Sequence, residues 1–576
     1  MTKVWKIKDV DKSITAGLAE CLNIHPVLCG LLAQRGVTDY DSAKSFFRPQ
    51  LGHLHNPFLM KGMASAVSRI EHALSHRETI MVYGDYDVDG TTSVAVVYSF
   101  LSKKFPEANV HYYVPHRYRE GYGVSEAGVR KAADLGVTLM ITLDCGIKSV
   151  GKAALAKQLG IDMIICDHHT PDEDQLPQAI AILNPKQSDC PYPYKELSGC
   201  GIGYKLISAL AAHYGLPAES TEKYLDLVAT SIAADIVPMD GENRILAFYG
   251  LKRANENPCL ALKTIRQIAA ITRPFTIADL VFIVAPRINA AGRMDDARKA
   301  IELFIEEDEL KSRQLAEVLH ADNFDRKEVD KNMTDEALGI LQTGHGADRH
   351  TTVLYRPHWH KGVVGIVASR LIEHYYRPTI ILTESNGKLT GSARSVNGFN
   401  IYEAIHQCGD LLENYGGHFF AAGMTLQTGN LEAFRQRFEQ VVKATIGPDS
   451  MNPVLHIDCE LNFKDIGRTF YNIVTQFEPF GPTNLRPVFI SRNVYDYKNC
   501  SKVVKEAHIR FVVAQPDGKY VMNGIGFGLA EKFEYLQPGK PFDMAYTIDE
   551  NEWNGTASLQ LKVIDIRPAT GLPKDN

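Results

Sequence analysis

The sequence predicts an α/β protein in which a parallel-sheet domain is followed by a long spanning helix, a second α/β domain and a small C-terminal β-barrel. From Thr79 onward, short apolar runs alternate with amphipathic stretches (92–104, 125–135 and 150–159), which is typical of a parallel sheet covered by helices. Residues 307–341 contain no proline and a single glycine, which predicts one unbroken helix about 50 Å long. Residues 455–567 form short alternating runs that favour a barrel.

The chain of 576 residues is too long for one hydrophobic core. Breaks at Gly36 and Pro49 interrupt an N-terminal helical stretch, and Pro448 and Pro453 mark a linker before the barrel. We therefore expect five parts: an N-terminal helical segment at 1–75, a parallel-sheet domain at 76–240, a helical connector at 241–345, a second α/β domain at 346–447 and an OB-like barrel at 455–567.

The composition is that of an ordinary globular protein, with 45% hydrophobic and 23% charged residues. No apolar run approaches the roughly 20 residues that cross a bilayer, and the first residues lack the apolar stretch of a signal peptide. The ten cysteines include no CxxC pair, so we expect reduced thiols and a cytoplasmic protein. The net charge of −6 argues against a basic coat for nucleic acid but allows a local basic groove.

Acidic or imidazole side chains end four apolar runs in the first 240 residues. The runs lead into Asp85–Asp89, Asp144, Asp167–His169 and Asp235, and each resembles the end of a buried strand. Open parallel sheets bind ligands outside the carboxyl ends of their strands. Because buried carboxylates are costly unless a cation lies among them, these ends predict a pocket for divalent metal ions. Mg²⁺ and Mn²⁺ prefer oxygen ligands with occasional imidazole, which fits this set.

The carboxylates of Asp85, Asp87 and Asp89 alternate along a segment predicted to be extended, so they cannot all face one way. We favour Asp87 and Asp89 as ligands because Gly90 follows them and opens a helix whose N-terminus could also hold phosphate. For a single Asp-Gly pair, a helix cap or surface loop would be the better explanation, and a lone His-His pair is more often structural. Four clusters at four strand ends outweigh that alternative.

Four motifs share their order and spacing with a known superfamily. They are GDYDVDG at 84–90, LDCG at 143–146, DHH at 167–169 and AADIVPMD at 233–240. This series resembles the metal-site motifs of the DHH phosphoesterase superfamily. One departure is Cys145, where the family usually carries asparagine, and it affects a hydrogen bond behind the neighbouring aspartate rather than a metal ligand.

Four further blocks extend the resemblance through the second α/β domain. They are PRINAAGRM at 286–294, WHKGVVGIVASR at 359–370, GSARS at 391–395 and GGHFFAAG at 416–423. Together with the barrel, residues 75–567 are similar to the bacterial single-strand-specific 5′→3′ DNA exonucleases of this superfamily. The resemblance implies release of 5′-mononucleotides in DNA repair and recombination, with single-strand-binding protein and a RecQ-type helicase as partners.

The resemblance also implies a pair of Mn²⁺ or Mg²⁺ ions in the acidic pocket. The residues that would hold them and act in catalysis are Asp87, Asp89, Asp144, His168 and Asp235. Asp85 and His169 would either ligate the ions or orient the ligands, and Asp144 would bridge them. Two ions about 3.5–4 Å apart can activate a water and stabilise the leaving oxygen of a phosphoryl displacement.

A phosphodiesterase must also neutralise phosphate charge, and the planar fork of arginine suits phosphate. The arginine candidates are Arg117, Arg119, Arg287 and Arg293, although a plain surface charge is the better explanation for Arg119. The resemblance further implies that the second α/β domain reads the 5′ end of the strand through Ser392, Arg394 and His418. Glycines at 391, 416 and 417 would allow close backbone approach there.

The barrel offers Phe511, Tyr520, Phe527 and Tyr546 as possible stacking platforms for bases. Most aromatic side chains of a small barrel fill its core, however, so we assign no barrel residue to DNA.

Three functions are weighed against each other. The first is a processive exonuclease on single-stranded DNA. The second is a DHH-family phosphodiesterase on short oligonucleotides, cyclic dinucleotides or pyrophosphate, which would need only the two α/β domains. The third is a scaffold with a decayed site, which the seven intact ligand candidates disfavour. The barrel and the long helix favour the first.

Overall fold

The computed structural model describes residues 3–294, 296–343, 349–553 and 555–569. The chain forms two compact units. The first contains residues 55–237 and 241–453, and the second contains residues 5–54, 238–240 and the chain from 454 onward. None of the helices in the described part of the chain is both long enough and apolar enough to span a membrane.

A five-stranded parallel sheet lies at the centre of the first domain, in the order β3-β2-β4-β5-β6. The strands are β2 (Thr79–Gly84), β3 (Asn109–Tyr113), β4 (Val137–Leu143), β5 (Asp162–Cys166) and β6 (Ala181–Leu183). Because all strands run the same way, their carboxyl ends share one edge of the sheet. Asp85, Asp144 and Asp167 follow β2, β4 and β5 at this edge. The predicted parallel sheet is confirmed.

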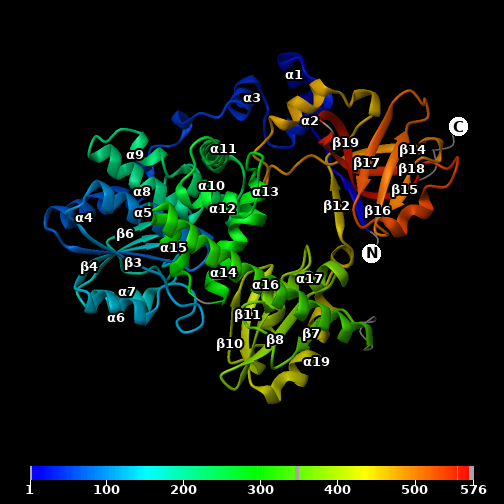
Figure 1. Ribbon diagram of the computed structural model, residues 1–576. Coiled ribbons are helices and arrows are strands. Elements are labelled where there is room, and N and C mark those ends of the chain that lie inside the picture. The colour runs from blue at the N-terminus through cyan, green and yellow to red at the C-terminus, as the bar shows by residue number, and fades with distance from the viewer. Residues whose placement is uncertain (1–2, 295, 344–348, 554, 570–576) are drawn as a thin grey trace. The chain divides into compact units, whose positions relative to one another are not determined.

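Helices cover both faces of this sheet (Figure 1). On one face lie α4 (Met63–Ser75), α5 (Val88–Lys104) and α8 (Gly199–His213), and on the other lie α6 (Glu126–Asp134) and α7 (Val150–Gln158). The three helices predicted from amphipathic stretches are therefore present. The first of them begins at Val88 rather than Thr92, because Asp87 caps it by accepting the N–H of Gly90 at 3.0 Å.

The run that ends at Asp235 was predicted to be a strand, and this prediction is wrong. Asp235 is the last residue of helix α10 (Leu225–Asp235), which packs against α5, α8 and α11 (Gly241–Glu256). A Cβ on Gly250 of α11 would lie 2.1 Å from the carbonyl oxygen of Leu225, so the two helices are in close contact. A helix buried on all sides has no amphipathic period, and a short apolar run alone does not separate it from a strand.

The connector consists of helices joined by short loops. It contains α12 (Leu260–Ile268), α13 (Ile277–Asp279), a π-helical turn (Leu280–Val284), α14 (Ala285–Met294), α15 (Arg298–Ile305) and α16 (Glu309–Thr343). The predicted long helix is confirmed as α16, with 35 residues. It contacts α12, α14 and α15 of the connector and α17 (Val364–His374) of the second α/β domain, so it spans between domains.

The second α/β domain has a mixed five-stranded sheet in the order β10-β11-β9-β8-β7. Its strands are β7 (Thr352–Tyr355), β8 (Thr379–Ser385), β9 (Lys388–Arg394), β10 (Asn414–Gly417) and β11 (Ala421–Leu426). Helices α17, α18 (Ile401–His406) and α19 (Leu431–Thr445) pack around it. The stacked rings of Phe434 and Phe438 lie in its core.

A closed β-barrel dominates the second unit. Its strands are β14 (Phe489–Asp496), β16 (His508–Ala514), β17 (Val521–Gly526), β18 (Phe542–Trp553) and β19 (Thr556–Pro568). The ring β14-β18-β19-β17-β16 closes because β14 pairs with both β18 and β16. Two short strands, β13 (Cys459–Glu460) and β15 (Lys502–Val504), flank the ring. Five strands in a closed ring are the architecture of an OB-fold, as predicted.

Part of the N-terminal helical stretch belongs to the barrel unit. Helices α1 (Lys12–Leu22), α2 (Pro26–Ala33) and α3 (Tyr40–Phe47) share a hydrophobic core with α20 (Arg468–Thr475) and the barrel strands. The reason is visible in α2, whose residues from Leu28 to Leu32 are all buried and need an apolar partner surface. Strand β1 (Val4–Ile7) pairs with β12 (Val454–Ile457) beside them.

Candidate metal centre and nucleic-acid pocket

The first acidic motif bends sharply at the end of β2. Asp85 follows the strand, Asp87 caps α5, and Asp89 lies in the first turn of that helix. A Cβ on Gly90 would lie 2.4 Å from the carbonyl oxygen of Asp85, so the turn requires glycine there. The predicted extended segment therefore ends at Asp87, and the helix rather than strand alternation sets the direction of Asp89.

Asp144 follows β4 in the left-handed backbone region, with φ of 58°. Its backbone N–H donates to the carbonyl of Cys166 at 2.9 Å, which ties this turn to the end of β5. The neighbouring Cys145 is buried among apolar side chains under α6 and α7, and burial raises the pKa of its thiol. The side chain of Cys145 is part of the core, so Asp144 is the residue of this turn that faces the acidic cluster.

The DHH motif places its three residues in different roles. His168 is buried and points at the acidic cluster, with Nε2 3.2 Å from Oδ1 of Asp144 and 3.5 Å from Oδ2 of Asp235. Asp167 accepts Nδ1 of His169 at 2.7 Å and the backbone N–H of Ile147 at 2.9 Å. Asp167 therefore orients His169, a role that the sequence pattern does not single out. The one sequence feature that could have indicated this role is the position of Asp167 directly after β5.

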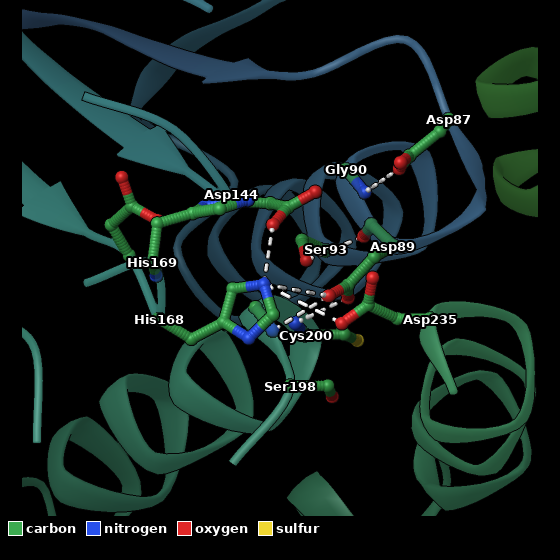
Figure 2. A network of polar contacts seen from close by, with 12 residues as sticks. Asp87, Asp89, Gly90, Ser93, Asp144, His168, His169, Ser198, Cys200 and Asp235 are labelled. Atoms are coloured by element: carbon green, nitrogen blue, oxygen red, sulfur yellow. Dashed lines mark hydrogen bonds and ion pairs between the residues drawn. The ribbon is translucent and has the colours of Figure 1, made fainter. Parts of the chain in front are cut away.

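All seven predicted ligands converge in the structure, and Figure 2 shows all of them except Asp85. Their ligand atoms form three groups, and within each group the atoms lie within 4.8 Å of one another. The groups are Asp85 with Asp87 and Asp144, Asp89 with His168 and Asp235, and Asp144 with His168 and His169. Asp144 and His168 each belong to two of the groups, so these two side chains together link the cluster.

The electrostatics of this cluster fit a cation. Burial raises the pKa of the Asp85 and Asp144 carboxyls well above the usual range. Repulsion adds to this effect, from Asp87 on Asp85 and from Asp89 on Asp144. Burial and Asp89 raise the pKa of Asp235 to about 8. Burial lowers the pKa of His168, which keeps the imidazole neutral and able to ligate. Oδ1 of Asp144 and both ring nitrogens of His168 are buried without a hydrogen-bond partner in the described structure. A divalent ion would satisfy Oδ1 of Asp144 and the ring nitrogen of His168 that carries no proton.

A cavity of about 650 Å³ opens beside the cluster and reaches the second α/β domain. Its walls include Asp167, His169 and Tyr122 from the first domain and Tyr402, Gly417 and His418 from the second. The hydroxyl of Tyr122 lies 3.1 Å from Nε2 of His169. Burial, and then Lys148, lower the pKa of His418. The predicted residues His169 and His418 thus share one cavity.

Three predicted phosphate partners form a second cationic cluster. Arg394 donates from Nη1 to Oγ of Ser392 at 2.7 Å, and a Cβ on Gly365 would meet its Nη2 at 2.8 Å, which places this pair under the first turn of α17. Arg117 lies over the ring of Tyr86. Burial, and then repulsion by Arg117, lower the pKa of Arg293 to about 10 and lower that of Arg394. Such mutual repulsion between cations favours an anionic ligand.

Two other arginine candidates differ from this cluster. Arg287 is buried on α14, where Nε donates to Nδ1 of His320 at 3.2 Å and Nη1 donates to the carbonyl of Ile283. Arg119 is exposed, as the surface-charge explanation expects. In the barrel, Phe511 and Tyr546 are fully buried, whereas Tyr520 and Phe527 are 46% and 59% exposed.

Fold and site together define a metal-dependent phosphoesterase of the DHH class. The family model described as the DHH family N-terminal domain matches residues 79–232, and the DHHA1 domain model matches residues 349–444. A third model, the RecJ OB domain, matches residues 457–565.

Similar proteins narrow this class to one family. The single-stranded-DNA-specific exonuclease RecJ of Bacillus subtilis is 36% identical over 97% of this chain and 70% of its own length. The RecJ of Salmonella typhimurium is 33% identical, covering 95% and 96%, and that of Escherichia coli is 32% identical, covering 94% and 96%. The chain belongs to the RecJ family of single-stranded-DNA-specific exonucleases.

Solved structures of RecJ agree with this family assignment. The crystal structure of RecJ in complex with Mn²⁺ from Thermus thermophilus matches with a TM-score of 0.83 and 26% identity, over 99% of this chain and 80% of that one. The Mg²⁺ complex of the same protein matches with a TM-score of 0.77 and 25% identity, over 99% and 79%.

Proposed function

We propose that this chain shortens single-stranded DNA from its 5′ end, releases 5′-mononucleotides by hydrolysis at the Asp144 cluster, and works in DNA repair and recombination. The observation that carries the proposal is the convergence of seven candidate metal-ligand side chains beside a separate cationic cluster around Arg394. The first can hold divalent ions, and the second can hold a phosphate. As a RecJ-family exonuclease the chain uses Mn²⁺ or Mg²⁺, and we propose two ions.

The ligand groups suggest how two ions would be divided. Asp85 and Asp87 would hold one, and Asp89, His168 and Asp235 the other. Asp144 would contact both because it groups with Asp85 and Asp87 and its Oδ1 lies 3.2 Å from Nε2 of His168. When bound, such a pair supplies an activated water and stabilises the oxygen that leaves the scissile phosphate. The candidate catalytic residues are thus Asp87, Asp89, Asp144, His168 and Asp235.

His169 is placed to act on the cavity side of the cluster. Nδ1 of His169 faces the carboxylate of Asp167 and therefore carries a proton. Nε2 of His169 faces Tyr122 and the cavity. A histidine held in this way presents the same nitrogen to every substrate, so we propose that it contacts the phosphate being transferred.

The 5′ end would be selected by the second α/β domain. Arg394 and Ser392 lie under the first turn of α17, whose backbone N–H groups favour an anion. Arg117 and Arg293 add positive charge, and His418 lines the cavity. We propose that this cluster binds the terminal phosphate and thereby sets the 5′→3′ direction.

The barrel supports a polymeric substrate over a dinucleotide. The strand register places Lys502, Arg510, Ile525 and Lys562 in one row across β15, β16, β17 and β19. The three cations of this row are exposed, and so is Phe527, which directly follows β17. Cations and an exposed aromatic ring on the outer strands of an OB-fold suit a single strand, so we propose that DNA lies on this face.

We further propose single-strand-binding protein and a RecQ-type helicase as partners, since both generate or hold the same substrate. The ten cysteines are all unpaired, which supports action in the reducing cytoplasm.

Long single strands labelled at either end test the main proposal. In Mn²⁺, a 5′ label should appear at once as a mononucleotide, whereas a 3′ label should stay in long products until late digestion. Early release of the 3′ label, or of labelled oligonucleotides, would overturn the assigned direction.

A further inference from the structure

The carboxylate of Asp89 is held by three hydrogen bonds that come from outside its own helix (Figure 2). The N–H of Gly199 donates to Oδ2 at 2.7 Å, and the N–H of Cys200 donates to Oδ1 at 2.8 Å. The hydroxyl of Ser231 donates to Oδ1 at 2.6 Å. The first two donors belong to the first turn of α8 and the third to α10. Because Asp89 is only 1% exposed, water does not compete for these positions.

These bonds leave Asp89 with one free coordinating position. Each carboxylate oxygen has two lone pairs. Oδ1 uses both, for Cys200 and Ser231, whereas Oδ2 accepts only Gly199. The oxygen that keeps a free lone pair is also the one that faces His168, with 3.8 Å between Oδ2 and Nε2. Asp89 therefore presents a single oxygen to its neighbours in the ligand group.

A second hydroxyl orients the first. Ser198 caps α8 by accepting the N–H of Gly201 at 3.1 Å, and its Oγ lies 2.7 Å from Oγ of Ser231. Ser231 has one hydroxyl proton, and the charged oxygen of Asp89 is the stronger acceptor for it. The proton between the two serines is then supplied by Ser198. A chain of donors runs from Ser198 through Ser231 to Asp89.

The same turn of α8 also contacts Asp144. A Cβ on Gly199 would lie 2.6 Å from Cβ of Asp144 and 2.9 Å from its Oδ1. Only glycine fits at this position without moving Asp144. The first turn of α8 therefore fixes Asp89 through hydrogen bonds and limits Asp144 by direct contact.

We propose that Ser231 is a positioning residue that, with the first turn of α8, restricts Asp89 to one-oxygen coordination of a divalent ion. This inference rests on the two-ion function proposed above. Without the hydroxyl, a lone pair of Oδ1 is freed and one of the three bonds that restrain the carboxylate is lost, so the ion shared with His168 and Asp235 is held less tightly. Contacts behind a metal ligand typically change metal affinity about 10- to 100-fold.

Mn²⁺ binding to the intact chain tests this role directly. Free Mn²⁺ is titrated by electron paramagnetic resonance with wild type, Ser231→Ala, Ser231→Thr and Thr230→Val. Thr230 is the matched control, because it is buried on the same helix and, in the described part of the chain, its hydroxyl donates to the carbonyl of Asp226 rather than to a ligand candidate. We expect Ser231→Ala to weaken one of two Mn²⁺ sites at least about tenfold. The threonine variant, which keeps the donor, and Thr230→Val should bind like wild type.

Activity adds a second readout. Because the defect lies in ion binding, Ser231→Ala should need more Mn²⁺ for half-maximal rate and should approach the wild-type kcat when Mn²⁺ saturates. If folded Ser231→Ala binds both ions as tightly as Thr230→Val, the proposal is overturned. If wild type itself binds fewer than two ions, the two-ion function fails instead. Should Ser231→Ala not fold, Ser198→Ala decides, since unchanged Mn²⁺ affinity in that folded variant would equally overturn the donor chain.

Discussion

Nε2 of His168 lies 3.2 Å from Oδ1 of Asp144, and neither atom has a hydrogen-bond partner in the described structure. Two buried acceptors at this distance repel unless a proton or a cation lies between them. Because burial lowers the pKa of His168 and raises that of Asp144, Asp144 carries this proton in the metal-free protein. A divalent ion can replace the proton, so metal binding should affect both activity and stability.

Removing the charge of Asp144 should abolish hydrolysis and leave DNA binding largely intact. Asp144→Asn keeps the size of the side chain but takes a negative charge from both ligand groups that contain it. We expect kcat to fall by at least about a hundredfold, as for loss of one transition-state contact. Rates in saturating Mn²⁺ and binding to a labelled strand measure the two effects. Asp162→Asn, at the half-buried start of β5, is the control, and a tenth of the wild-type rate in Asp144→Asn would disprove the shared role.

End selection should depend on Arg394. Arg394→Ala removes the charge beside Ser392 and should weaken the preference for 5′-phosphorylated over 5′-hydroxyl strands. A charge-assisted hydrogen bond contributes about 1.5–3 kcal/mol, or roughly tenfold to over a hundredfold. Competition between the two strand types gives the preference ratio. Lys388→Ala removes a cation of the same strand that pairs with Glu413, and its ratio should not change. An unchanged ratio for Arg394→Ala would mean that this end of β9 has a structural role only.

The cationic row of the barrel should matter for long strands only. The triple variant Lys502→Ala, Arg510→Ala and Lys562→Ala should bind long single strands more weakly and with a flatter salt dependence. Each lost phosphate contact lowers the slope of log K against log salt by about 0.7 on a single strand. Cleavage of dinucleotides should hardly change. Lys540→Ala, an exposed lysine outside the row, is the control. Equal losses on long and short substrates would mean that DNA runs elsewhere.

Metal affinity should rise with pH up to about 8. Burial, and then Asp89, raise the pKa of Asp235 to about 8, so a proton must leave before this carboxylate can bind an ion at lower pH. In the metal-free protein the folded state holds this proton up to about pH 8, whereas the unfolded chain releases it near its ordinary value of about 4. Folding stability without metal therefore falls as pH rises through that window.

Melting temperatures with and without Mn²⁺ at pH 6 and pH 8 check this linkage. Stabilisation by Mn²⁺ should be larger at pH 8, because binding there does not compete with the proton. Asp235→Asn should reduce the difference between the two pH values. A gain that is equal at both pH values in wild type would contradict the raised pKa.

Much of the fold and of the ligand set could be predicted because their signals are local. A strand that ends in a carboxylate is visible in a few residues, which is why Asp85, Asp144 and His168 could be placed at one sheet edge. Asp235 was recognised as a ligand candidate but given the wrong secondary structure. A helix packed against Gly250 on one side and α5 and α8 on others shows no period that separates it from a strand.

Other features depend on contacts between distant segments. Ser231 and Gly199 lie 142 and 110 residues from Asp89, and nothing in a serine or a glycine of an apolar helix indicates that partner. The packing of α2 against the barrel joins residues near 30 to residues near 470 and could not be inferred from either end. The sequence gives the same reason to predict a phosphate contact for Arg287 as for Arg293. In the structure, however, the guanidinium of Arg287 donates to His320 and to the carbonyl of Ile283.

The left-handed backbone at Asp144, with φ of 58°, and at Ile236, with φ of 60° directly after Asp235, separates two kinds of selection. Glycine and asparagine adopt this conformation with little penalty, whereas it costs most other residues roughly 1–2 kcal/mol. A library screened for folded protein alone would therefore drift toward glycine and asparagine at both positions. A library screened for DNA degradation should recover only aspartate at 144 and yet still accept glycine at 236. A comparison of the two libraries would show that the residue at 144 is selected for activity, whereas the residue at 236 is not.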